Sequence, residues 1–198
     1  MKPRTIGATT VSAIGIGAMH FSFAQPTDDE RSIRAVHAAL DAGVRLIDTA
    51  LCYTTMESPL DEATGIRISH NEQVVRRALE NHPLRDEVLV ATKGGHHRSG
   101  PQEFPKDGRP ESIRTHCEMS LRTLGVEALG LYQMHWPDPD VPIAETMGAF
   151  ADLQREGKVQ MVGGSNFSIA QIEEALTVCE LVSVQNHFNP LVLGDRET

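Results

Sequence analysis

The chain has 198 residues, of which 40% are hydrophobic, and this length suits one globular domain covering residues 1–198. It carries 18 basic and 27 acidic side chains, a formal net charge of −9, and has no basic stripe or tail. This charge balance argues against binding to nucleic acid or to an anionic membrane.

The cysteine content and the first residues bear on localisation. Cys52, Cys117 and Cys179 are odd in number and lack a C-x-x-C spacing, which is typical of reduced, packed cysteines in a cytosolic protein. The opening "MKPRTIGATT" lacks the apolar stretch of a signal peptide, and no run approaches the ~18–20 apolar residues of a membrane span. We therefore expect a cytoplasmic protein.

Short apolar runs and helical segments alternate along the chain. The N-terminal segment 4–12 is predicted to form a hairpin. The apolar runs that follow are near-continuous, as in strands buried on both faces of a parallel sheet. They span 13–19, 44–50, 87–93, 129–136, 159–166 and 181–188.

The helical segments between these runs have recognisable ends. The segment 27–43 begins with a predicted capping box, Thr27 to Glu30, and stops at Gly43. A second capping box, Ser168 with Gln171, opens the segment 168–178. The remaining helices are predicted at 70–81, 110–125 and 143–157. This alternation predicts a parallel sheet, either open or closed into a barrel.

Two loops are longer than usual for such a fold, 54–70 and 94–108. Both follow the C-terminal ends of strands, where parallel sheets bind their ligands. The adjacent His96 and His97 cannot readily chelate one ion together, so we expect them in a solvated part of the second loop.

The first strand is followed by too few glycines for an open dinucleotide-binding sheet. Gly15 and Gly17 form a G-x-G, but His20 stands where the third glycine of G-x-G-x-x-G belongs. This pattern disfavours a Rossmann fold and leaves the closed barrel as the better prediction.

In a barrel the polar residues at successive strand ends converge on one mouth. They are Asp48, Lys93, His135, Asn166 and Gln185. Each alone is equally well explained as an ordinary polar strand end, except Lys93, whose buried ammonium needs a partner. Asp48 is the obvious candidate.

Tyr53 would complete a chemical unit with that pair. A free tyrosine has a pKa near ~10, too high for a ready acid at neutral pH. A neighbouring cation lowers that pKa, so Lys93, held by Asp48, would make Tyr53 a tuned general acid. His135 could direct a carbonyl oxygen by hydrogen bonding.

Asp48, Tyr53, Lys93 and His135 resemble the catalytic tetrad of the aldo-keto reductases. Five motifs look like that family's segments, in its order: "GVRLIDTALCY", "LVATKGG", "LGLYQMHWPD", "VGGSNF" and "VQNHFNPL". The resemblance covers essentially the whole chain. It implies a (β/α)8 TIM barrel of the aldo-keto reductase type, with its first six βα units present here.

By this resemblance the protein reduces an aldehyde or ketone to an alcohol by hydride transfer from NAD(P)H. The family favours NADPH, and NADH is not excluded. Tyr53 would protonate the carbonyl oxygen, and Tyr53, His135 and Trp136 would contact the substrate. The implied cofactor-binding residues are Gly17, Ala18, Met19, Asp48, Ser165, Asn166, Gln185 and Phe188.

The sequence also departs from the family's pattern. Thr54 stands where many relatives have glycine, which affects the expected shape of the substrate pocket. The chain stops at Thr198, just after the sixth strand, whereas the resemblance implies two more βα units that grip the cofactor's phosphates. From the length that the resemblance implies, we expect the sequence to be part of a chain of roughly 300 residues.

Two alternatives remain open. Asp48, His20, His135 and His187 all fall near strand ends and could gather round the metal of a hydrolase. Lys93 would be a poor neighbour for a cation, however, and we expect no metal. The second alternative is a truncated, non-catalytic binding or regulatory protein of the same family.

Overall fold

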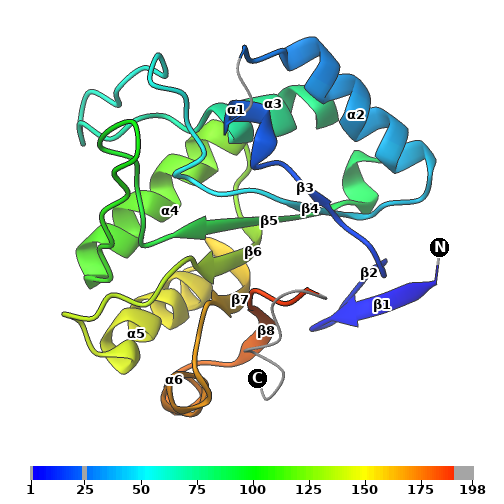
Figure 1. Cartoon of the computed structure of the whole chain (residues 1–198). Helices are drawn as coiled ribbons and strands as arrows, with labels where there is room; N and C mark the ends of the chain where they lie inside the picture. The colour runs from blue at the N-terminus through cyan, green and yellow to red at the C-terminus, as the bar shows by residue number, and fades with distance from the viewer. Residues whose placement is uncertain (1, 24–25, 190–198) are drawn as a thin grey trace.

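Six strands run parallel and in chain order in the computed structural model, which describes residues 2–23 and 26–189 (Figure 1). The predicted parallel sheet is confirmed, although the first strand is far shorter than the expected 13–19. The strands are β3 (Ile16–Gly17), β4 (Leu46–Asp48), β5 (Leu89–Gly94), β6 (Leu129–Met134), β7 (Val159–Ser165) and β8 (Leu181–Gln185).

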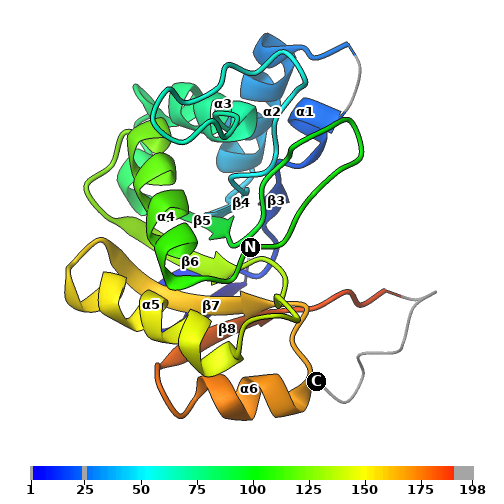
Figure 2. The ribbon, with the colours of Figure 1, turned by 90° about the vertical axis from the view of Figure 1, so that its left-hand side faces the viewer.

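Helices connect successive strands and pack along the curved sheet (Figure 2). A 3-10 turn at Arg85–Glu87 precedes β5. The helices are α1 (His20–Phe23), α2 (Asp29–Asp41), α3 (His70–Leu79), α4 (Pro110–Leu124), α5 (Ile143–Arg155) and α6 (Ile169–Ala175).

The helix ends follow local chemistry. The predicted capping box at α6 is confirmed, because the Ser168 side chain accepts from the Gln171 amide and the Gln171 side chain accepts from the Ser168 amide. The box predicted at Thr27 is wrong. Asp28 is the N-cap of α2, with extended backbone and a carboxylate that accepts from the Arg31 amide at 2.8 Å. A carboxylate there also interacts favourably with the helix dipole.

The sheet has an apolar layer on each face, which explains the near-continuous apolar runs. The larger layer packs the sheet against the helices and includes Ile47, Tyr132 and Phe150. The inner layer consists of Val11, Leu89, Ala91, Leu131 and Met161. Both layers form by burial of aliphatic and aromatic surface.

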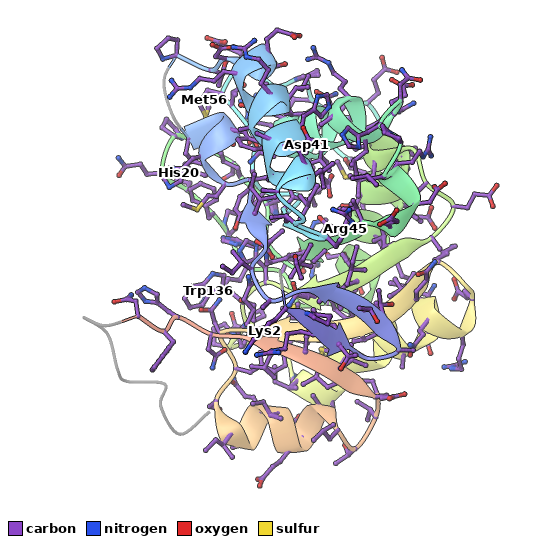
Figure 3. The ribbon with its side chains drawn as sticks, turned by 90° about the vertical axis from the view of Figure 1, so that its right-hand side faces the viewer. Lys2, His20, Asp41, Arg45, Met56 and Trp136 are labelled. Atoms are coloured by element: carbon purple, nitrogen blue, oxygen red, sulfur yellow. The ribbon has the colours of Figure 1, made fainter. Side chains whose placement is uncertain are left out.

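The inner layer is covered at one end by the predicted N-terminal hairpin, which is confirmed. Strands β1 (Pro3–Ile6) and β2 (Thr9–Ser12) pair antiparallel, and Val11 of β2 joins the inner layer. Figure 3 shows this end of the molecule, with Lys2 and Arg45 labelled. The Arg45 amide donates to the Ser12 hydroxyl at 2.8 Å, which fastens the hairpin to the start of β4.

The sheet is curled, so that strands far apart in its order meet. Gln185 at the end of β8 donates to the Asp48 carboxylate at the end of β4, at 3.1 Å. This contact crosses the concave side and brings the strand ends onto one mouth, as in a partial (β/α)8 barrel. Over the described residues, none of the helices has the length and apolar character needed to cross a membrane.

Candidate active site

The ion pair between Lys93 and Asp48 lies at the centre of the strand ends. Lys93, the fifth residue of β5, is 2% exposed, and its ammonium donates to both Asp48 oxygens at 2.7 Å and to the Thr49 carbonyl at 2.9 Å. Three acceptors satisfy the three ammonium protons, which is what a buried lysine requires. The predicted pairing of these two residues is therefore observed.

Tyr53 and His135 flank this pair. The Lys93 ammonium is 5.7 Å from the centre of the Tyr53 ring, and the Tyr53 and His135 rings meet edge to face at 5.7 Å between centroids. Burial, reinforced by Lys93 and His96, holds the pKa of His135 well below its ordinary value. The imidazole is therefore neutral at physiological pH.

The prediction that Lys93 lowers the pKa of Tyr53 is not met in this structure. Burial raises that pKa above its ordinary value, and Cys52 and Asp48 act in the same direction. The physical reason is that the Lys93 charge is compensated by Asp48, so desolvation dominates at the phenol. Tyr53 consequently holds its proton firmly at neutral pH.

The residues expected to hold a carboxamide lie together at the ends of β7 and β8. The Ser165 hydroxyl donates to the Gln185 carbonyl at 2.8 Å, and the Asn166 side-chain amide donates to the His135 carbonyl at 2.9 Å. Asn166 adopts a positive φ of 62°, a conformation that asparagine tolerates better than most residues. Amide and hydroxyl groups are thus concentrated beside the ion pair.

The other residues expected at the cofactor differ in their exposure. Met19 and Phe188 are exposed by 42% and 61%, unusually high values for large apolar side chains. A Cβ added to Gly17 would meet nothing within 4 Å, whereas Ala18 is buried.

The mouth is also lined by aromatic rings, several of which the sequence did not indicate. Phe23 packs edge to face on Tyr53 at 6.0 Å and stacks on Phe104 at 5.9 Å. Trp136, 40% exposed, lies under the Lys106 ammonium at 5.0 Å. Phe23 and Phe104 come from separate segments, so only the folded chain reveals that they are neighbours.

Arg98 ties the second long loop to the first. Its guanidinium donates to the carbonyls of Thr54, Gly100 and Pro101 and lies 5.2 Å from the Phe23 ring centre. The two long loops therefore close over the same side of the mouth.

The prediction that His96 lies in a solvated loop is wrong. The loop folds back through a bridge between His96 and Lys106, which buries the His96 ring 5.0 Å from that of His135. His97 is half-buried, with its ring 5.9 Å from that of His116. His96 is thus a site residue that sequence reasoning missed, and two adjacent histidines in a polar loop give no periodic signal that could have found it.

The metal arrangement considered for a hydrolase is not formed. Within residues 2–23 and 26–189, the only group of three potential metal ligands consists of Cys52, His96 and His135, so His20 and His187 stay apart from it. Cys52 Sγ lies 3.5 Å from His135 Nδ1, and burial raises the pKa of the thiol to about 12.

Comparison with known proteins agrees with this geometry. The model of the Aldo/keto reductase family matches residues 13–198. The aldo-keto reductase YhdN of Bacillus subtilis is 36% identical over 193 residues, covering 96% of this chain and 54% of the relative. An uncharacterized oxidoreductase of Schizosaccharomyces pombe is 34% identical over 188 residues, covering 93% of this chain and 56% of the relative.

Solved structures show the same fold. The glycerol dehydrogenase of Gluconobacter oxydans has a TM-score of 0.82 and 34% identity, covering 96% of this chain and 56% of that protein. The holo form of an aldo-keto reductase from Bacillus halodurans has a TM-score of 0.76 and 30% identity, covering 95% and 58%. The chain spans about half the length of the curated relatives it matches. Its sheet, its helices and its sequence together place the chain in the aldo/keto reductase family of oxidoreductases.

Proposed function

We propose that this protein reduces an aldehyde or ketone to the alcohol, with NADPH as the hydride donor. The observation that carries the proposal is the buried Lys93–Asp48 pair beside the Tyr53 and His135 rings. A mouth lined by aromatic rings, next to the proposed proton donor Tyr53, suits a small carbonyl compound.

Tyr53 is the proposed general acid. Burial raises the pKa of its phenol, so the phenol gives up its proton only as the carbonyl oxygen gains negative charge and becomes basic enough to accept it. Lys93, 5.7 Å from the ring centre, stabilises the phenolate left behind. Asp48 holds Lys93 in place through both carboxylate oxygens.

His135 is the proposed orienting donor. Its imidazole is neutral, and the protonated thiol of Cys52 lies 3.5 Å from Nδ1. Donation from the thiol to Nδ1 places the ring proton on Nε2, which can then donate to the substrate carbonyl. Cys52 is thus a positioning residue in this proposal.

The cofactor would lie along the ends of β3, β7 and β8. When bound, a reduced nicotinamide supplies the hydride. Ser165, Asn166 and Gln185 would bind its carboxamide, Phe188 would stack on its ring, and the segment 17–19 would border it. Asp48 would contact the same region through its bond to Gln185.

The proposal also covers the cellular compartment, the class of substrate and the domain organisation of the protein. The three cysteines are free thiols in the structure, which supports a reducing compartment such as the cytoplasm. The net charge of −9 supports a small-molecule substrate rather than nucleic acid. We further propose that residues 1–198 belong to one barrel domain.

A two-part assay tests the proposal. NADPH and NADH are first titrated into the purified protein by calorimetry, and NADPH oxidation is then followed at fixed pH with a panel of aldehydes and ketones. We expect tighter binding of NADPH and turnover of at least one carbonyl. Binding without any turnover would identify a non-catalytic binding protein, and absence of binding would overturn the cofactor assignment.

A further inference from the structure

Three potential metal ligands converge beside the proposed active site. Cys52 Sγ and one ring nitrogen each of His96 and His135 all lie within 4.8 Å of one another, and the three residues are buried. Cys52 follows β4, His96 follows β5, and His135 follows β6. No step of carbonyl reduction requires His96, so its position calls for a separate explanation.

His96 is oriented as metal-binding histidines usually are. Its Nε2 lies 2.8 Å from the Phe104 carbonyl, which can only accept, so Nε2 carries the proton. Its Nδ1 is then unprotonated and has a free lone pair, and this atom is buried with no hydrogen-bond partner. Buried polar atoms normally have a partner. A ligating histidine typically donates its other N–H to a carbonyl in this way.

We propose that Cys52, His96 and His135 form a binding site for a divalent ion of the Zn²⁺ type. One thiolate and two imidazoles are the ligands such borderline-soft ions prefer. Zn²⁺ bond lengths of about 2.0–2.3 Å place tetrahedral ligand atoms about 3.3–3.6 Å apart. Cys52 Sγ and His135 Nδ1 are already at 3.5 Å, so a shift of the His96 ring would complete the triangle.

The charges around the site are compatible with a cation. Cys52 would bind as the thiolate, releasing its proton to solvent and offsetting one of the two positive charges of the ion. The ammonium of Lys93, which acts electrostatically on both Cys52 and His135, is already paired with both oxygens of Asp48. Three protein ligands leave a fourth position for water.

Binding of the ion would link three neighbouring strand ends and fix the segment that carries Tyr53. It would also hold Nδ1 of His135, leaving Nε2 as the ring's free position. This site goes beyond the proposed reductase activity, and its occupancy can be measured without cofactor or substrate.

Titration of the metal-free protein with Co²⁺ tests the proposal. We expect one equivalent to produce a thiolate-to-cobalt charge-transfer band in the near ultraviolet, which Zn²⁺ then displaces. Thermal unfolding should occur at a higher temperature with Zn²⁺ than without it. Absence of the band at stoichiometric Co²⁺ would overturn the site.

Matched variants identify the ligands. Cys52→Ser should abolish the band, whereas Cys179→Ser, which changes a half-buried cysteine outside this group of ligands, should preserve it. His96→Gln keeps the thiol and should weaken Co²⁺ binding by at least about tenfold, since even outer partners of metal ligands are worth about 10–100-fold. A band that survives Cys52→Ser, or an unchanged affinity in His96→Gln, would contradict the assignment whatever the reductase assay shows.

Discussion

The Lys93 ammonium is the most constrained charge of the site, with all three of its protons donated to oxygen atoms of residues 48 and 49. Such a pair costs desolvation free energy, and removing one partner of a buried pair is destabilising by about 3–5 kcal/mol. The pair nevertheless places a positive charge 5.7 Å from the Tyr53 ring centre, where a phenolate would form. Its proposed role is therefore electrostatic as well as structural.

Lys93→Met should lower turnover strongly and move the alkaline limb of the pH–rate profile to higher pH. The reason is that loss of the ammonium leaves the Asp48 carboxylate, which already raises the pKa of Tyr53, uncompensated, so the phenol loses its proton only at higher pH. Initial rates measured across pH check this. Lys158→Met, on the surface beside Glu118 and Glu156, is the matched control and should leave the profile unchanged. If Lys93→Met lowers turnover but keeps the wild-type profile, Lys93 acts only as a structural residue.

For single residues, the sequence predicts those ion pairs in which a buried charge requires a partner of opposite sign. A lysine at the end of an apolar strand needs an anion, so Asp48 could be named in advance. The raised pKa of Tyr53 could not be predicted from the sequence, because it depends on how far the folded loops bury the phenol. The burial of His96 depends likewise on the loop folding back to the Phe104 carbonyl.

Among the elements, β5 packs closely against its neighbours because Gly94 is its last residue and Gly95 follows it. A Cβ on Gly94 would overlap the Tyr132 hydroxyl of β6 and approach the His116 Cβ of α4 at 3.2 Å. Gly95 has a φ of 78°, which favours glycine, and its amide donates to His116 Nδ1 at 3.0 Å. These glycines allow β5, β6 and α4 to pack closely directly after Lys93.

Gly94→Ala should destabilise the protein by about 1–3 kcal/mol or more, because overpacking forces Tyr132 to move. Gly148→Ala in α5 is the same chemical change at a position where a Cβ meets nothing within 4 Å. It should be neutral or stabilising by up to about 1 kcal/mol, since alanine favours helix. Urea unfolding of the three proteins provides the comparison. Equal stability of Gly94→Ala and wild type would show that this close packing is absent in solution.

The order and type of the strands and helices could be predicted from the apolar runs and the helix-end residues. The exact first and last residues of these elements could not be predicted in the same way. The first strand shrinks to Ile16–Gly17 because only those residues pair with β4. At α2 both Thr27 and Asp28 are acceptable N-caps by residue type. The backbone path selects Asp28, and that path depends on tertiary packing.

Over the whole molecule, buried ionisable groups should make stability depend on pH. Burial raises the pKa of Glu72 from 4.5 to about 7, while Thr92 donates to its Oε1 at 2.6 Å. Glu72 binds its proton more tightly in the folded state, so its contribution is fully present below pH 4.5 and lost as pH rises through about 7. His116 acts oppositely. Burial lowers its pKa from 6.5 to about 4, so its contribution is present above pH 6.5 and lost as pH falls.

Glu72→Gln isolates the first of these effects. Because the amide cannot ionise, the free energy of unfolding of wild type relative to Glu72→Gln should rise by about 3 kcal/mol as pH falls from 7.5 to 4.5. Urea unfolding at several pH values measures this difference. Glu118→Gln makes the same chemical change at a partly exposed carboxylate and is the matched control. A constant difference for Glu72→Gln would show that Glu72 is not held in a desolvated site.

The sheet holds the first six strands of an eight-stranded barrel. Within the described residues, β3 and β8 each pair with one neighbouring strand only, and the matched relatives are about twice as long. The six strands nevertheless bring together the four residues of the proposed catalytic tetrad and the proposed carboxamide-binding group. The chemistry at the strand ends can therefore be tested separately from the question of barrel closure.

The most direct measurement is the rate of NADPH oxidation, with a carbonyl substrate, by Tyr53→Phe compared with wild type at one pH and the same chain length. The change removes the phenolic proton donor and little else, so turnover should fall by about 10²–10⁴-fold, while NADPH affinity stays within about twofold. A variant that retains more than about a tenth of wild-type turnover would contradict the assignment of Tyr53 as the general acid.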